Sequence, residues 1–365
     1  MEILVGINRW NRRIFGRLKR LLGVKLSYIR IVVYSLFYNH FTDLYYAADT
    51  CMEPLFWIVD HCAKAMGPIF VATITIVGSA IVTIAYTIGI PYWWNRNVYV
   101  LIVAVVIGHW LLVNIVFHYW MALWTDPGMP PEGSQLSEVV TVCKKCIAPK
   151  PPRTHHCSVC NRCILKMDHH CPWLNNCIGH FTHRYFFLFC CYILLGILYL
   201  MIFGYSIAYE EYFGSSYEGA VLTTEVPHGK SAATLASAGH NGTSTKPTLS
   251  AAAAARRYYI TFTMLVCIGV LCALGALTAW HAQLITKGET SIEAHINKKE
   301  RQRLAKEGIV YRNPYDFGPQ QNWRIFLGLT RQRSWRQVLL PSRHLPEGNG
   351  LTWETAGQRV NAIQR

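Results

Sequence analysis

Four long stretches of the chain contain no Asp, Glu, Lys or Arg, and polar segments separate them. These stretches cover residues 65–95, 97–125, 185–209 and 258–286. A helix rises about 1.5 Å per residue, so roughly 20 apolar residues cross the hydrocarbon layer of a membrane, and every stretch exceeds that length. Core helices of soluble proteins seldom run this far without a charge. The pattern predicts an all-α integral membrane protein with spans at about 69–90, 98–122, 185–206 and 258–283.

A short polar segment, residues 91–97, separates the first two stretches and contains Trp93 and Trp94. Tryptophan is enriched where a membrane meets water. We therefore expect a brief connection there, which makes residues 65–125 a transmembrane hairpin.

Positive charge is distributed unevenly between these spans. The formal net charge is +15 although the mean hydropathy is positive, at +0.19. Thirty of the 35 Lys and Arg residues lie in segments 1–64, 126–184 and 287–365, which an even number of spans places on one side of the membrane. The positive-inside rule assigns that side, with both termini, to the cytosol.

The segments outside the spans differ in character. Residues 1–64 are basic, and the short apolar stretch Ile31–Phe41 predicts an amphipathic surface helix rather than a fifth span or a secretory signal. Residues 207–257 are rich in Ser, Thr, Gly and Ala and predict a flexible luminal loop that ends in the run Ala251–Ala255. A glycosylation sequon begins there at Asn241. Residues 284–365 form a cytosolic C-terminal tail.

Seven of the 13 cysteines lie between Cys143 and Cys177, in the pattern C-x2-C-x9-H-C-x2-C-x2-C-x4-D-H-H-C-x5-C. Cytosolic thiols stay reduced, and C-x2-C pairs direct two thiolates at one tetrahedral ion. The segment is too short and too polar to bury a large core, so structural zinc would supply folding energy. The sequence predicts a cytosolic two-zinc cysteine-rich domain over residues 126–184, between the second and third spans.

The odd number of cysteines leaves one thiol over if two Cys3His sites form. Cys171 is a candidate because it follows Asp168, His169 and His170 directly. A thiol needs a neighbouring base to become a thiolate, and a carboxylate can orient that imidazole. The alternative is that Cys171 is another ligand in a purely structural zinc module, and spacing alone does not decide between them.

The stretch Asp168–Trp173 in this cysteine frame resembles the DHHC protein S-acyltransferases, the membrane palmitoyltransferases. The resemblance covers residues 65–330. It includes a DPG motif at Asp126–Gly128 and a TTxE-like motif at Thr290–Glu293, in which Ser291 replaces the second Thr. Further matches to the C-terminal palmitoyltransferase motif are Asn313-Pro314-Tyr315, Gly318, Asn322-Trp323 and Phe326-Leu327-Gly328.

The resemblance implies a role for each residue of the motif. It assigns Cys171 as nucleophile, His169 as base and Asp168 as the residue that orients His169. Trp173, Ser291 and Asn313 would support the acyl cavity or the active site, although Asn313 also suits a simple turn. The implied zinc ligands are Cys143, Cys146, His156 and Cys163 for one ion, and Cys157, Cys160, His170 and Cys177 for the other.

The activity implied by the resemblance is transfer of a long-chain acyl group from palmitoyl-CoA, through an acyl-Cys171 enzyme, to cysteines of membrane-associated proteins. Two structural zinc ions, acyl-CoA and the lipid bilayer are the expected cofactors and partners, and nucleic acid is not expected. The expected location is the endoplasmic reticulum, with the Golgi as the alternative. The competing function is a non-catalytic, membrane-anchored zinc module that recruits protein partners.

Overall fold

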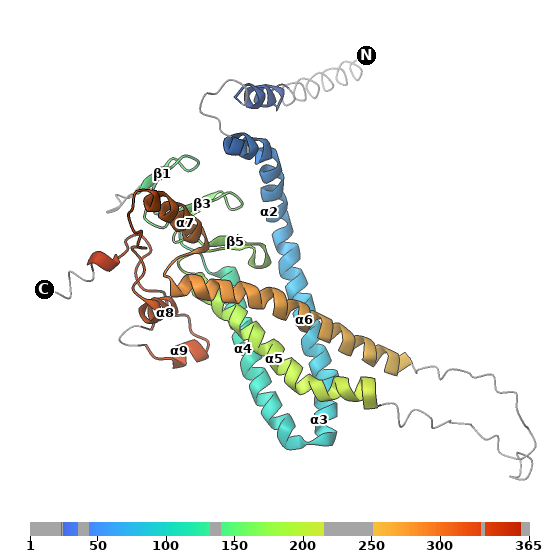
Figure 1. Cartoon of the computed structure of the whole chain (residues 1–365). Coiled ribbons are helices and arrows are strands. Elements are labelled where there is room, and N and C mark those ends of the chain that lie inside the picture. The colour runs from blue at the N-terminus through green and yellow to red at the C-terminus, as the bar shows by residue number, and fades with distance from the viewer. Residues whose placement is uncertain are drawn as a thin grey trace, which may run out of the picture. The chain divides into compact units, whose positions relative to one another are not determined.

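The computed structural model describes residues 23, 25–35, 44–131, 140–214, 251–329 and 333–358 (Figure 1). The chain divides into two units, Met1–Ala65 and Met66–Arg365. In the first unit, residues 25–35 are helical and helix α2 (Leu44–Ile84) begins. The rest of the expected surface helix and the sequon at Asn241 lie outside the described residues.

Four helices among the described residues are long and apolar enough to cross a membrane: Cys62–Arg96, Val98–Trp124, His183–Phe213 and Ala251–Thr286. The first comprises part of α2, the π-helix η1 (Ala85–Gly89) and α3 (Ile90–Arg96). The other three are α4 (Val98–Trp124), α5 (His183–Phe213) and α6 (Ala251–Thr286). They confirm an all-α membrane fold in which the cysteine-rich segment separates the second and third membrane helices.

The ends of these helices differ from the expected spans. The connection expected at residues 91–97 is mostly helical, because α3 continues directly from η1 with Gly89 and Ile90 in helical conformation, and Pro91 follows this π-helical turn. Asn97 alone breaks the helix, and its side chain caps α4 by accepting bonds from the Tyr99 and Val100 amides. The run Ala251–Ala255 is the first turn of α6 rather than loop, as the high helix propensity of alanine favours.

Helix α5 packs between α4 and α6. Phe187, Leu188 and Tyr192 of α5 join Leu111 of α4 and Ile285 of α6 in one buried cluster. Helices α4 and α5 approach closely at Gly108, where an added Cβ atom would lie 2.7 Å from the Tyr199 hydroxyl oxygen and would displace that side chain.

The cysteine-rich segment folds into three antiparallel hairpins: β1 (Thr141–Cys143) with β2 (Ala148–Lys150), β3 (His155–Cys157) with β4 (Arg162–Ile164), and β5 (His169–Cys171) with β6 (Asn176–Ile178). Figure 1 shows β1, β3 and β5 following one another beside α7 (Ser291–Lys306), near the end of the bundle where α6 leads into α7. Cys157, Ile164, Met167 and Cys177 form their small core. Such a core suits a domain that depends on metal for stability.

Two contacts fix the hairpins to the end of α4. The Asn176 side-chain amide donates to the carbonyls of Ala122, Leu123 and Thr125, which have no partner within the helix. Beyond the helix, Asp126 accepts the Gly128 amide, and the Gly128 carbonyl accepts the Leu165 amide. The DPG segment thereby joins the membrane helix to the hairpins.

The C-terminal part contains α7, α8 (Pro319–Leu327) and α9 (Arg336–Leu339). It continues into an extended segment, residues 342–353, which we call the C-terminal strap. Arg184 donates to the carbonyls of Ser342 and His344, and the His180 ring donates to that of Gly348. The strap is therefore bound to the start of α5 and to the loop that precedes it.

Candidate active site and metal centres

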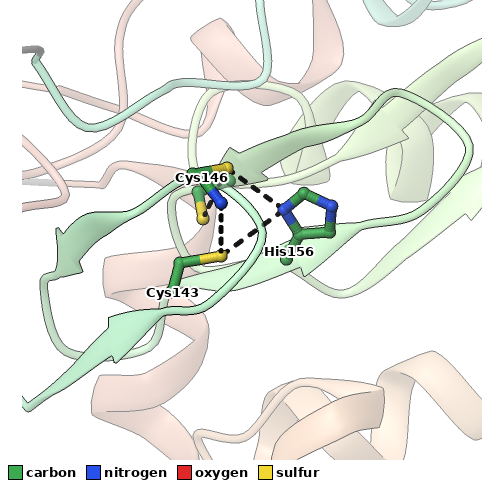
Figure 2. A group of neighbouring side chains, drawn as sticks. Cys143, Cys146 and His156 are labelled. Carbon is green, nitrogen blue, oxygen red and sulfur yellow. Dashed lines mark hydrogen bonds between the residues drawn. The ribbon is translucent and has the colours of Figure 1, made fainter.

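The first group of metal-binding side chains joins two hairpins. Figure 2 shows Cys143, Cys146 and His156 converging, with His156 Nδ1 3.6 Å from the Cys143 sulfur and 3.2 Å from that of Cys146. The Cys163 sulfur completes the group, 3.8 Å from the Cys146 sulfur. The Cys146 amide points at the Cys143 sulfur from 3.4 Å, as is favourable for a thiolate.

The second group repeats this arrangement with Cys157, Cys160, His170 and Cys177. His170 Nδ1 lies 3.9, 3.4 and 3.6 Å from the sulfurs of Cys157, Cys160 and Cys177 respectively. The sulfurs of Cys160 and Cys177 are 3.4 Å apart.

These separations fit a bound metal ion. Zinc bonds of about 2.3 Å to sulfur and about 2.0 Å to nitrogen place the ligands of a tetrahedral site roughly 3.5–3.8 Å apart. Both imidazoles present Nδ1 to the sulfurs. Each group can therefore hold one metal ion with four protein ligands.

The strand register explains how the ligands are shared. His156 pairs with Cys163 across β3–β4, and His170 pairs with Cys177 across β5–β6. Each pair combines with the C-x2-C turn of the preceding hairpin. Cys171 occupies the same position in the third hairpin as Cys157 does in the second. Among the described residues no further hairpin follows that could supply a His–Cys pair, so Cys171 belongs to neither metal group.

The His169–Cys171 strand separates the neighbouring side chains. Successive residues of a strand point to opposite sides, so His169 and Cys171 share one side while His170 faces the metal group on the other. The His169 ring interacts with the Cys171 thiol, which is buried with Leu174, Tyr185 and Phe186. A histidine and a thiol thus meet in an apolar environment.

Asp168 completes this group and is almost fully buried, at 1% exposure. Its Oδ2 atom lies 2.6 Å from His169 Nδ1, and its Oδ1 atom accepts the Ser291 amide at 2.7 Å. The Ser291 hydroxyl donates to the Asp168 carbonyl at 2.7 Å. Burial opposes ionisation, but the hydrogen bond from His169 and the surrounding imidazoles hold the pKa of Asp168 well below its usual range.

The pKa of the His169 imidazole is shifted upward, in the opposite direction to that of Asp168. Burial by itself would lower its pKa, but the hydrogen bond to Asp168 and the contact with Cys171 raise the pKa of His169 to about 9. The three side chains are therefore electrostatically linked.

A buried ion pair supports Ser291. Arg153 Nε and Nη2 each lie 2.6 Å from an oxygen of Glu293. Glu293 also accepts the Thr290 amide while the Thr290 hydroxyl accepts the Glu293 amide, so the two residues form a capping box at the start of α7. Burial would raise the pKa of Glu293, but Arg153 keeps it below its usual range.

The roles expected for Trp173 and Asn313 stay predictions. Trp173 is 48% exposed, and its ring centroid is 4.6 Å from that of Phe70. Asn313 closes a surface turn, donating to the Lys287 carbonyl and accepting the Tyr315 amide, which matches the simple turn considered for it.

Two residues near the site were not predicted from the sequence. His281 of α6 has its Nδ1 atom 3.8 Å from Asp168 Oδ2, and Arg153 is the ion-pair partner of Glu293. Both are distant in sequence from the residues they contact, so no local pattern indicated them. One signal was available: His-His-Cys recurs after 14 residues, at 155–157 and 169–171, and relates Cys171 to Cys157.

Comparison with known proteins is consistent with this arrangement. The family model of the DHHC palmitoyltransferases matches residues 138–298. Human palmitoyltransferase ZDHHC16 is 44% identical over 345 residues, which cover 94% of this chain and 90% of the human protein. The zebrafish (Danio rerio) palmitoyltransferase ZDHHC16B is 44% identical, with 90% of this chain and 87% of the relative covered. The probable protein S-acyltransferase 16 of Arabidopsis thaliana is 32% identical, with coverage of 67% and 78%.

Within the family, segments such as Lys144–Cys146 and His295–Glu300 predict similarity to the sixteenth animal member, Abl-philin 2. The relatives named ZDHHC16 confirm that prediction. Identity of this extent, over nearly the whole of both chains, places the protein in the DHHC palmitoyltransferase family.

Proposed function

We propose that this chain is a protein S-palmitoyltransferase in which Cys171 carries the acyl group between donor and acceptor. Family membership and the palmitoyltransferase relatives support the activity. The observation that carries the residue assignment is the linked group of Asp168, His169 and Cys171, beside two metal groups that leave that one thiol free.

In the first half-reaction, His169 takes the proton of the Cys171 thiol. Its Nδ1 atom is bonded to Asp168, which leaves Nε2 for the thiol. The thiolate attacks the carbonyl carbon of the acyl-CoA thioester, a new C–S bond forms, and the bond to the CoA sulfur breaks. The departing CoA thiolate takes the proton back from His169. An acyl-Cys171 enzyme and free CoA result.

In the second half-reaction, the thiol of a substrate cysteine loses its proton to His169 and attacks the acyl-Cys171 carbonyl. The acyl group passes to the substrate, and Cys171 leaves as a thiolate that recovers the proton. The acceptors are cysteines of membrane-associated proteins, because the reacting thiol lies beside the membrane helices.

Two zinc ions are the proposed metals, and their function is structural. Each site has four protein ligands and therefore no coordination position for a catalytic water. The ions supply folding energy that the small core of the hairpins lacks. The protein residues perform the chemistry.

The acyl chain would lie between the membrane helices. Burial stabilises each CH2 group by about 0.8 kcal/mol, so a palmitoyl chain is costly to hold in water. Cys171 itself packs against Ala122 near the end of α4 and Cys190 in the first part of α5, and an apolar cavity lies further along the bundle, lined among others by Leu101, Ala104 and Gly204. The excess of Lys and Arg supports a cytosolic active site near the phosphates of CoA and anionic lipids. The proposed location is the endoplasmic reticulum, with the Golgi as the alternative.

The test is covalent labelling of purified protein with an alkynyl analogue of palmitoyl-CoA. Wild type should acquire a label that hydroxylamine removes, and Cys171→Ser should acquire none while retaining two zinc ions per chain. Cys272→Ser, which changes an exposed thiol of α6, is the matched control and should be labelled like wild type. Equal labelling of Cys171→Ser and wild type would refute the mechanism and favour the non-catalytic adaptor.

A further inference from the structure

Trp353, in the C-terminal strap, contacts Arg153 and Lys166 of the cysteine-rich segment. Its ring centroid lies 4.7 Å from Arg153 Cζ and 5.4 Å from Lys166 Nζ. Tyr315 covers the same guanidinium, with its centroid 4.4 Å from Arg153 Cζ. The two rings meet at 70°, so they form an aromatic corner around Arg153.

The strap holds Trp353 in this place by contacts that do not involve Arg153. The Trp353 indole donates to the Gly350 carbonyl, and His180 donates to that of Gly348. Gly350 has a φ of +76°, and a Cβ atom there would lie 2.9 Å from the His180 ring. A change of the side chain at 353 removes the indole bond to Gly350 and the ring contact with His180, whose centroid lies 5.3 Å from that of Trp353. The bond between His180 and the Gly348 carbonyl does not depend on that side chain and keeps the strap attached.

Arg153 in turn is linked to the residues that hold Asp168. Besides its paired bonds to Glu293, it donates to the Gly288 carbonyl at 3.0 Å, and its own carbonyl accepts the Met167 amide at 3.2 Å. Glu293 caps α7, which places Ser291 against Asp168. Arg153 thus reaches Asp168 through the α7 cap and through the neighbouring residue Met167.

We propose that Trp353 is a positioning residue of the acyl transfer, because it fixes Arg153 and thereby the carboxylate of Asp168. This proposal rests on the proposed function of Asp168 and Cys171. It goes beyond the family model, whose match ends at residue 298.

The physical reason lies in the ion pair between Arg153 and Glu293. The Arg153 side chain is only 5% exposed, so its charge needs partners on every side. The faces of a guanidinium are poorly satisfied by hydrogen bonds but well satisfied by aromatic rings. Removing one ring admits water, loosens Arg153 and lets the α7 cap shift away from Asp168.

The test compares Trp353→Leu, which removes the π face, with Trp353→Phe, which keeps one. The initial rate of acyl-Cys171 formation would be measured in purified protein over a range of palmitoyl-CoA concentrations. Trp353→Leu should lower the saturating rate about tenfold and leave the half-saturating concentration unchanged. Trp353→Phe should react at close to the wild-type rate. The matched control is Trp335→Leu, at a tryptophan that is 61% exposed, and it should change neither quantity.

A second comparison tests the route through Arg153. Arg153→Lys keeps the charge but loses the paired bonds to Glu293, so it should also slow acylation. Trp353→Leu should then slow the Arg153→Lys protein little further, since residues of one network are not additive. Zinc content and thermal unfolding of each variant show whether the domain remains folded.

Three results would overturn the proposal: a wild-type saturating rate in Trp353→Leu, equal slowing in Trp353→Phe and Trp353→Leu, or full additivity with Arg153→Lys. Failure of the proposed function is distinguishable from these, because it appears as undiminished labelling of Cys171→Ser.

Discussion

His169 and His170 face opposite sides of the strand His169–Cys171. This alternation separates the residues proposed for the reaction from the residue that faces the metal group. His170 joins a metal group, whereas His169 meets Cys171 and Asp168. A shift of one residue in the β5–β6 register would exchange the two histidines. The pairing of His170 with Cys177 is therefore as important to the proposed reaction as the identity of the residues.

The buried side chain of Lys166 should make the stability of the protein depend on pH. Burial, reinforced by Arg153, lowers the pKa of Lys166 to about 7, while Glu293 and Asp168 oppose the shift. His180 and His183 also face the ammonium group. The ordinary pKa of lysine is about 10.4, so between pH 7 and pH 10 the unfolded chain binds more protons here than the folded chain. Stability should consequently rise with pH in that window.

The measurement is thermal unfolding of wild type and Lys166→Met from pH 7 to pH 10. The wild-type midpoint minus the variant midpoint should increase as the pH rises, because a methionine at this position cannot titrate. A difference that stays constant with pH would contradict the lowered pKa.

At the scale of elements, the three hairpins form a chain in which each shares a metal with the next. The β3–β4 hairpin contributes His156 and Cys163 to one group and Cys157 and Cys160 to the other. Loss of one ion should therefore loosen the hairpin that holds the second. Asp168 lies directly before β5 in this unit, and the start of α7 holds it through the Ser291 amide.

Zinc measurements test this sharing. Cys157→Ser and Cys177→Ser should each lower the content from two ions per chain, with reduced expression, because a hydroxyl replaces a thiolate ligand. Cys171→Ser is the matched control, and it should keep both ions. An unchanged zinc content in Cys157→Ser and Cys177→Ser would refute the ligand assignment.

At the scale of the whole molecule, the uneven charge should orient the four membrane helices. Thirty Lys and Arg residues lie on the side proposed to be cytosolic, and five on the other. In sealed microsomes, added protease should remove epitope tags from both termini and spare a tag inserted within residues 215–250. Protected termini would reverse the proposed orientation.

Much of this organisation followed from local sequence. The uncharged stretches indicated the membrane helices because length and apolarity suffice for a span, and the C-x2-C pairs indicated metal binding because adjacent thiols share one turn. Helix ends were less accurate: the propensity of Ala251–Ala255 was outweighed by the polar loop composition that precedes it. Asn97 likewise escaped notice, because a cap is defined by its hydrogen bonds.

The sequence by itself determined the long apolar helices and the uneven charge, since both depend on composition, and the short cysteine spacings indicated metal binding without deciding how the ligands are divided. Only the tertiary structure decided what holds Asp168. Ser291, Arg153, His281 and Trp353 come from four separate parts of the chain and converge around it or its supports. Such convergence depends on how helices and loops pack, which no local periodicity encodes.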